Sequence, residues 1–331
     1  MQRDPDAPPP ARVPPSLTRG APSLWALVAL ALTLLAASVA LVLLREARGP
    51  RPPFLADTTA KPVPVSPAAA ATPGALELAG SGSNLPLTRA LVEAFRARNS
   101  DSKLTVHESI GTTGGVRAVR DGAIHVGLAS RPLTADEGLH DLVVTPYARV
   151  AVVVATNAGV PDACTTRDDL LAMYAGTRTR WRDGSRLVVL QRERGDSSLL
   201  VFGNLVPGLF AENDAAHREN RWRVVYSDLA MQEALIATEG AVGIFDLGAI
   251  EAQRLPLNVL CVDGVMPSRE SMLSGRYPFF KDLAFVTVGA PAGLAAELVA
   301  FVLSSAGREL TVRLGYAPLP LEPAKAGALS P

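Results

Sequence analysis

The sequence predicts an α/β fold of two lobes, preceded by a single membrane-spanning helix. Three observations point to this class. Strand-like and helix-like segments alternate from residue 75 onward, which is typical of sheets covered by helices. These segments are too many for one small sheet, so two lobes are expected in a chain of 331 residues. Near the N-terminus, residues 25–44 form an uncharged apolar run.

The apolar run reads WALVALALTLLAASVALVLL and would span roughly 30 Å as a helix, about one hydrocarbon core. We therefore expect a transmembrane anchor over residues 22–44. A cleaved secretory signal is the alternative, because Ser38, Val39 and Ala40 resemble a cleavage site. The run continues to Leu44 and exceeds a usual signal core, which favours an anchor that is retained.

Segments rich in Pro and Ala flank the anchor and predict disordered chain. We expect a cytoplasmic tail over residues 1–21, a tether over 45–74 and a short tail over 323–331. The folded domain is expected over residues 75–322. Its first lobe would comprise about 75–148 and 265–322, and its second lobe about 149–264.

The folded domain opens with three units of strand, small-residue loop and helix. ALELAG (75–80) alternates like a strand and ends in the loop SGSN (81–84). KLTVHES (103–109) ends in GTTGG (111–115), and AIHVGLAS (123–130) ends in Ser130 and Arg131. A helix is expected after each loop. After the third loop, the spacing of Thr134 and Glu137 fits a capping box.

Strands that alternate with helices imply parallel pairing, and ligands bind at the carboxyl ends of such strands. All three loops fall at that edge. Each loop also precedes a helix N-terminus, where free N–H groups and the helix dipole favour an anion. A plain tight turn explains any one glycine-rich loop, but three in succession predict an anion pocket.

The second half repeats the pattern. We expect a long apolar strand over 145–156, a helix capped by Thr166 and ending at Gly176, and a strand in RLVVLQRERGDSS (186–198). The remaining predicted segments are strands at VVYS, AVGIFD, LNVLCVDG and LAFVTVG, a helix from Asp228 to Thr238, and a final helical stretch from Pro291 to Gly315.

Composition and motifs exclude several functions. Thirty-two basic and 32 acidic side chains balance, and no basic stripe mixed with aromatics appears, so we expect no nucleic-acid partner. The four histidines are scattered without metal-ligand spacing, which predicts no metal site. Neither a G-x-S-x-G elbow nor a phosphate-binding P-loop is present. We expect no enzyme activity and no cofactor.

Several segments resemble, in order, the type II periplasmic binding proteins, and among them the phosphate-binding subunit of the ABC-type phosphate importer. They are GAVGIFDLGAI, VDGVMPSRESMLSGRYPFFKDLAFVT and FVLSSAGRELTVRLGYAPL. The resemblance covers about residues 76–321. It implies the type II two-lobed fold and an anion held in the cleft between the lobes.

In that family, backbone amides and hydroxyls of four segments hold the anion. Carried onto this sequence, the resemblance implies phosphate-binding roles for Gly82, Ser83, Thr112, Thr113, Gly114, Ser130, Arg131, Arg192, Asp196, Ser197 and Ser198.

Two positions depart from the common pattern of the family. Arg131 stands where many members have an Asp, and Asp196 stands where the family usually has a serine. An ionised carboxylate only accepts hydrogen bonds, so it favours an anion that still carries a proton. We expect Asp196 to select phosphate over sulfate, with Arg131 and Arg192 balancing charge. Alternatively, Asp196 caps the following helix, Arg131 or Arg192 is an ordinary ion-paired side chain, or both roles coexist.

The resemblance implies an extracytoplasmic protein, anchored in the membrane, that captures phosphate by hinge closure and delivers it to an ABC permease. We expect a monomer. The alternative is a membrane-anchored sensor or interaction protein that keeps the fold without transport. Cys164 and Cys261 would lie in an oxidising compartment, where a disulfide and two reduced buried thiols both remain open.

Overall fold

The computed structural model describes residues 75–137 and 141–320. Its strands form one hydrogen-bonded network in the order β2-β1-β3-β10-β4-β8-β6-β7, with β9 and β11 on β4 and β5 on β9. The described strands are β1 (Ala75–Gly80), β2 (Lys103–Val106), β3 (Val126–Ala129), β4 (Leu142–Asn157), β5 (Cys164–Thr165), β6 (Val188–Arg192), β7 (Arg223–Val225), β8 (Ala241–Asp246), β9 (Leu257–Val262), β10 (Phe280–Val288) and β11 (Ala317–Pro318).

Helices connect most of these strands. The described helices are η1 (Gly82–Asn84), α2 (Leu85–Arg96), α3 (Gly111–Arg120), α4 (Arg167–Ala175), α5 (Ser197–Leu205), α6 (Leu209–Arg218), α7 (Asp228–Ala237), α8 (Leu247–Gln253), α9 (Arg269–Leu273), α10 (Gly293–Leu303) and α11 (Ser305–Arg313). Several begin with a side-chain cap. Thr166 accepts a hydrogen bond from the Asp169 N–H at the start of α4, and Gly176 ends that helix in the left-handed conformation, as the sequence predicted.

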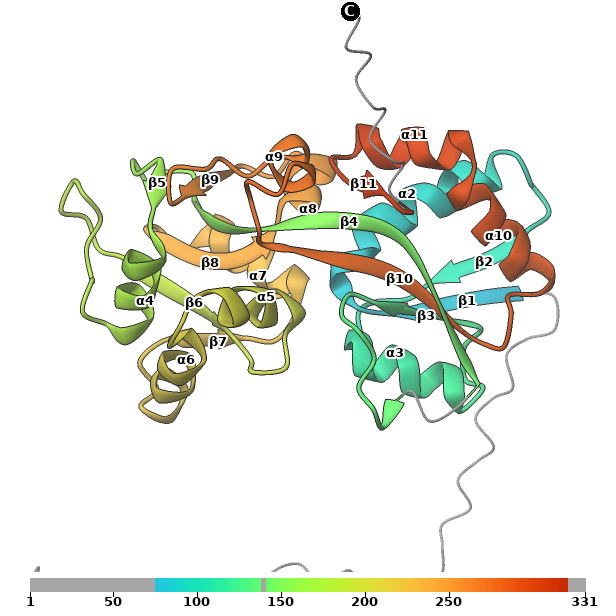
Figure 1. Cartoon of the computed structure of the whole chain (residues 1–331), viewed down its shortest axis with the longest axis horizontal. Helices are drawn as coiled ribbons and strands as arrows, with labels where there is room; N and C mark the ends of the chain where they lie inside the picture. The colour runs from blue at the N-terminus through green and yellow to red at the C-terminus, as the bar shows by residue number, and fades with distance from the viewer. Residues whose placement is uncertain (1–74, 138–140, 321–331) are drawn as a thin grey trace, which may run out of the picture. The chain divides into compact units, whose positions relative to one another are not determined.

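One hydrophobic core lies against β1, β2 and β3. These strands pair in parallel, and β10 joins β3 in antiparallel orientation. Leu87, Leu91 and Phe95 of α2 pack in this core at helical spacing together with Leu298 of α10. In Figure 1, α2, α10 and α11 lie on one side of this sheet and α3 lies on the other. Both faces are therefore covered, which suits its apolar parallel strands.

A second core lies around β6, β8 and β9. The strands β6 and β8 pair in parallel, and β7 extends the sheet beyond β6. Buried side chains of α4, α5 and α7, including Met173, Phe202 and Leu235, pack against this sheet. All six residues of β8 are buried, as expected for a central strand covered on both faces.

Two long strands connect the cores. Tyr147, Ala148 and Val150 of β4 contribute to the first core, and Ala151 to Ala155 contribute to the second. β10 pairs in antiparallel orientation with β4 from Leu142 to Ala151, and Figure 1 shows the two strands running together from one core to the other. These paired strands place loops of both cores around a common space.

Three predictions need correction. The strands are not all parallel, because β4 and β10 run antiparallel to their neighbours. The segment GTTGG is not a loop: α3 begins at Gly111, so these residues form its first turns. The stretch from Pro291 to Gly315 is two helices, because Ser304 is extended and its side chain accepts a hydrogen bond from the Gly307 N–H to start α11.

The question of the two cysteines is resolved. Cys164 and Cys261 form a disulfide between β5 and β9, where they are paired in register. The predicted tail 1–21, anchor 22–44, tether 45–74 and tail 323–331 lie outside the described residues. Within residues 75–137 and 141–320, no helix has the length and apolar character needed to cross a membrane.

Candidate functional site

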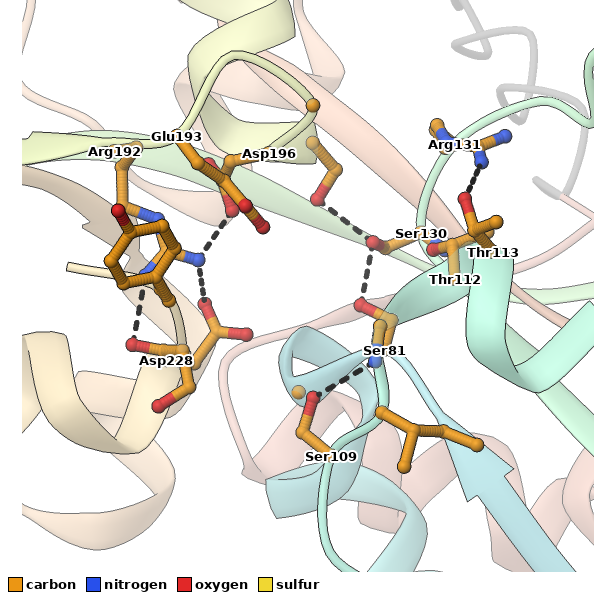
Figure 2. A pocket seen from close by; sticks show the side chains of 17 residues that line it. Ser81, Ser109, Thr112, Thr113, Ser130, Arg131, Arg192, Glu193, Asp196 and Asp228 are labelled. Atoms are coloured by element: carbon orange, nitrogen blue, oxygen red, sulfur yellow. Dashed lines mark hydrogen bonds and ion pairs between the residues drawn. The ribbon is translucent and has the colours of Figure 1, made fainter. Parts of the chain in front are cut away.

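A cavity of about 310 Å³ lies between the loops of the two cores (Figure 2). Most residues predicted to bind an anion line it. They are Gly82, Thr112, Thr113, Ser130, Arg131, Arg192, Asp196 and Ser197. Three predicted residues do not line it, namely Ser83, Gly114 and Ser198. The structure thus brings together residues that lie more than one hundred positions apart in the sequence.

Three helices begin at the cavity wall. Gly111 is the first residue of α3, Ser197 of α5 and Asp228 of α7, and all three line the cavity. The first N–H groups of a helix have no partner within the helix, and the helix dipole places partial positive charge there. Three such ends around one small cavity favour a bound anion.

Hydroxyl groups link the two sides of the cavity. Ser130 Oγ donates to Ser197 Oγ at 2.8 Å, which joins the loop after β3 to the start of α5. Ser81 Oγ lies 2.7 Å from Ser130 Oγ, and the Ser130 N–H donates to Thr112 Oγ1 at 3.2 Å. These groups are neutral donors that can pair with anion oxygens without a net charge.

Arg131 is held by an acidic partner. Its guanidinium donates two hydrogen bonds of 2.8 Å to the carboxylate of Glu137 and one of 2.8 Å to Thr113 Oγ1. The hydrogen bond from Arg131 lowers the pKa of Glu137 to about 2. Glu137 also accepts from the Thr134 N–H, which is one half of the predicted capping box. Arg131 therefore lines the cavity as one member of an ion pair.

Arg192 is buried between two carboxylates. Its Nη2 pairs with Asp196 Oδ2 and lies 3.4 Å from Asp228 Oδ1, while Nη1 donates to the Ser227 carbonyl at 2.8 Å (Figure 2). The buried Arg192 Nε has no hydrogen-bond partner among the described residues. Burial opposes the charge of Arg192, but the two carboxylates outweigh it and raise the arginine's pKa.

Asp196 caps α5, which confirms one of the two roles predicted for it. Its Oδ1 accepts hydrogen bonds from the N–H groups of Ser198 at 3.0 Å and Leu199 at 2.9 Å. Its other oxygen pairs with Arg192. Burial works against the ionised form, yet Arg192 keeps the pKa of Asp196 below its usual value. Both oxygens of this carboxylate are thus committed within the protein.

The sequence did not single out Asp228 as a site residue, although it lines the cavity. Burial raises the pKa of Asp228 to about 6, and Arg192 only partly opposes this shift. Its Oδ2 accepts no hydrogen bond from the described residues, and its side chain is 19% exposed. A Cβ on Gly82 would lie 2.2 Å from Asp228 Oδ2, so glycine is required for this close approach.

A buried ionic cluster behind the cavity wall was also missed. Lys281 Nζ lies 2.9 Å from Asp246 Oδ1, and it donates to Ser83 Oγ and Ser198 Oγ, both at 2.7 Å. These contacts explain why Ser83 and Ser198 are near the cavity without lining it. A signal existed, because strand alternation places Lys281 on the same inward side as Phe279 and Leu283. A lone lysine on an apolar face predicts a buried ionic role.

Within the described part of the chain, no group of three or more His, Cys, Asp or Glu side chains could hold a metal ion. The arrangement instead offers helix N-termini and hydroxyls. Its cationic side chains already have carboxylate partners. Such a site suits a small oxyanion that carries a proton, since it offers many donors and at least one carboxylate acceptor.

Comparison with known proteins agrees with the fold. A family model described as "PBP superfamily domain" matches residues 66–306. The chain is 26% identical over 258 residues to the phosphate-binding protein PstS of Bacillus subtilis, covering 74% of this chain and 81% of that protein. It is also 26% identical over 270 residues to the protein SphX of Synechococcus elongatus, covering 73% and 76%.

Among solved structures, a candidate phosphate ABC transporter substrate-binding protein of Clostridium perfringens, with bound phosphate, matches with a TM-score of 0.65 and 20% identity, covering 74% of this chain and 99% of that chain. An ABC-type phosphate transport receptor of Vibrio cholerae matches with a TM-score of 0.54 and 20% identity, covering 73% and 99%. At this identity the likeness establishes the fold alone.

Proposed function

Because the chain belongs to the PBP superfamily, we propose that it is an extracytoplasmic solute-binding protein that captures inorganic phosphate for an ABC-type importer. One observation carries the proposal: three helix N-termini and a row of hydroxyls surround a single small cavity between two hydrophobic cores. The names of the relatives agree with phosphate as the ligand. The anion is bound and released without chemical change.

The two cores correspond to two lobes that close on the anion. We assign about residues 75–148 and 265–322 to the first lobe and about 149–264 to the second. The strands β4 and β10 cross between them and are the natural hinge, because they are the long elements shared by both cores. Closure brings Ser130 of the first lobe against Ser197 of the second.

The anion is held mainly by neutral donors. Gly82, Thr112, Thr113 and Ser197 would surround it with N–H and O–H groups. Ser130, whose N–H and O–H donate to Thr112 and Ser197, would hold these two hydroxyls in place. Removing an anion from water is costly unless its oxygens are paired, so a complete set of donors is needed. Arg131 balances charge from within its ion pair. Ser83, Gly114 and Ser198 support the wall from behind.

A carboxylate acceptor would distinguish phosphate from sulfate. Monohydrogen phosphate can donate one hydrogen bond and sulfate cannot, so an ionised carboxylate in the cavity repels sulfate more strongly. Asp196 was expected to fill this role, but both its oxygens are engaged by α5 and Arg192. Asp228 lines the cavity and keeps Oδ2 available. We therefore assign the larger share of the discrimination to Asp228.

The disulfide also bears on the cellular compartment in which the protein acts. A disulfide between Cys164 and Cys261 fits an oxidising compartment outside the cytoplasm. We propose that residues 22–44 anchor the protein in the cytoplasmic membrane, that residues 45–74 tether the domain, and that the protein is a monomer docking on permease subunits. Resistance of the full chain to alkaline carbonate extraction from membranes would support the anchor, and release into the supernatant would contradict it.

The binding function is tested by calorimetric titration of the full chain in mild detergent, freed of ligand by partial unfolding and refolding. We expect one site that binds phosphate more tightly than sulfate. Absence of heat with both anions, from a protein shown to be folded by circular dichroism, would contradict phosphate capture. That outcome would favour an anchored interaction protein instead.

The assignment of the acceptor is tested with two variants. Asp228→Asn removes the uncommitted carboxylate, and we expect the preference for phosphate over sulfate to fall by roughly ten- to hundredfold, as for loss of a charged hydrogen bond. Asp196→Asn is the matched control, and it should lower stability through the cap and the Arg192 pair with a smaller change in preference. A larger change with Asp196→Asn would return the role to Asp196.

A further inference from the structure

Lys281 is the buried cation that the proposed binding site does not account for. It lies on β10, its side chain is 3% exposed, and its ion-pair partner Asp246 at the end of β8 is 1% exposed. Lys281 does not line the cavity. A buried ion pair contributes little net stability compared with apolar packing, so its presence here calls for another role.

The ammonium group contacts hydroxyls from both cores. Nζ donates to Ser83 Oγ of η1 at 2.7 Å, and to Ser198 Oγ at 2.7 Å and Ser197 Oγ at 3.1 Å at the start of α5. An ammonium group only donates hydrogen bonds, so every hydroxyl that it contacts must act as the acceptor. Lys281 thereby fixes the orientation of hydroxyls that would otherwise rotate freely.

The fixed hydroxyl orientation matters most at Ser197, because Ser197 lines the cavity. Its oxygen accepts from Ser130 Oγ at 2.8 Å and lies 3.1 Å from Lys281 Nζ, which has no lone pair that could accept the Ser197 hydrogen. Because the Ser130 hydrogen is used in this bond, Ser81 must donate to Ser130 across their 2.7 Å contact (Figure 2). The hydroxyls therefore form a directed chain from Ser81 to Ser130 to Ser197.

The hydrogen of the last hydroxyl in this chain can be accepted neither by the Lys281 ammonium nor by Ser130, which donates to it. This hydrogen must point away from both Lys281 and Ser130. We propose that Lys281 is a positioning residue that holds Ser197 as an obligatory hydrogen-bond donor to the bound anion. The site then requires an unprotonated oxygen at Ser197, while Asp228 accepts from a protonated one, so the anion is bound in one orientation. This inference rests on the proposed oxyanion function.

The test is a double-mutant cycle on the full chain in mild detergent, with phosphate affinity measured by calorimetry. One change replaces Lys281→Met together with Asp246→Asn, so that no buried charge is left unpaired. The other is Ser197→Ala. We expect each change alone to weaken phosphate binding roughly ten- to hundredfold, as for loss of one hydrogen bond to a charged group. The combined variant should bind no more weakly than either alone.

The matched control removes another ion pair that involves β10. Arg149 and Asp282 pair at 2.6 Å on β4 and β10, outside the cavity lining, and Arg149→Met with Asp282→Asn also leaves net charge unchanged. This variant should bind phosphate as the unmodified chain does. If the Lys281 and Asp246 pair variant does not fold, Lys281→Leu with Asp246→Asn enters the same cycle with the same expected coupling.

Two outcomes would overturn the inference while leaving phosphate capture intact. In one, the Lys281 variant binds phosphate with unchanged affinity. In the other, the fold-loss of phosphate affinity in the combined variant equals the product of the two separate losses. That result would mean that Lys281 acts independently of Ser197. An unmodified chain that is folded but binds neither phosphate nor sulfate would overturn the proposed function and, with it, this inference.

Discussion

Asp228 is the carboxylate to which we assign the choice between phosphate and sulfate. It is the first residue of α7, where the helix dipole favours negative charge, yet burial raises its pKa to about 6. The charged groups around it are Arg192 on β6, Asp196 before α5, Asp246 on β8 and Lys281 on β10. These comprise two cations and two further carboxylates. Ionised Asp228 therefore leaves the cluster with an excess of negative charge.

The raised pKa predicts that sulfate binding improves in acid. Above pH 6 Asp228 is ionised and repels an anion without a proton. Below pH 6 the carboxyl is neutral and its O–H can donate to sulfate. We expect sulfate affinity to rise as pH falls from about 7 to about 5. Calorimetric titration across this range measures it. In Asp228→Asn the sulfate affinity should not change with pH. An equal pH dependence in that variant would mean that another group titrates.

At the scale of elements, the sequence predicted much of the site because its loops directly follow strands. The ends of β1, β3 and β6 and the caps Thr166 and Asp196 were found by alternation and capping residues. The antiparallel pairing of β4 with β10 was missed, because it joins segments such as Arg149 and Asp282 that are 133 residues apart. No local pattern encodes that distance. The partners of Lys281 were missed for the same reason, since they come from three other elements.

The glycines of α3 illustrate a tertiary contact overriding local preference. Glycine disfavours helix, so GTTGG was predicted as a loop. In the structure Gly115 packs directly on β1, where an added Cβ would lie 2.7 Å from Gly80 Cα and 2.9 Å from the Ala79 carbonyl oxygen. The close approach of α3 to β1 therefore depends on the missing side chain. It also places Thr112 and Thr113, one turn earlier, at the cavity wall.

Gly115→Ala should lower the free energy of unfolding by about 1–3 kcal/mol, because the new methyl group meets backbone atoms that cannot move aside. Urea unfolding measures the change. Gly114→Ala is the control in the same helix: its Cβ would meet only the Ile110 side chain at 3.1 Å, and that side chain is exposed. The control should be neutral or slightly stabilising. Equal loss in both variants would argue against the contact with β1.

The disulfide joins β5 to β9 at the edge of the second core. It closes a loop with a sequence separation of 97 residues, so it constrains the unfolded chain strongly. Replacing both cysteines by serine should cost about 2–5 kcal/mol of unfolding free energy. Phosphate affinity should stay unchanged, since neither cysteine lines the cavity. Thermal unfolding and calorimetric titration of the same variant check both parts, and a weakened phosphate affinity would link this edge to the site.

At the scale of the whole described region, β4 and β10 make the two cores interdependent. Val150 belongs to the first core and Ala151, the next residue, to the second. Strands of both cores hydrogen-bond to β4, with β10 and β11 on its first half and β8 and β9 on its second. Unfolding of either core would remove hydrogen-bond partners from β4, and the other core also contains part of β4. The same continuity allows a hinge without a separate linker.

We therefore expect both cores to unfold in a single transition, and phosphate to stabilise them equally. An anion that binds only the folded protein, at about 100 times its dissociation constant, raises the free energy of unfolding by about 2.7 kcal/mol. Hydrogen-exchange mass spectrometry in increasing urea can follow peptides from α2 in the first core and α7 in the second. Their midpoints should coincide without phosphate and shift together with it. Separate midpoints, or protection of one core alone, would mean that the cores are independent folding units joined by a flexible hinge.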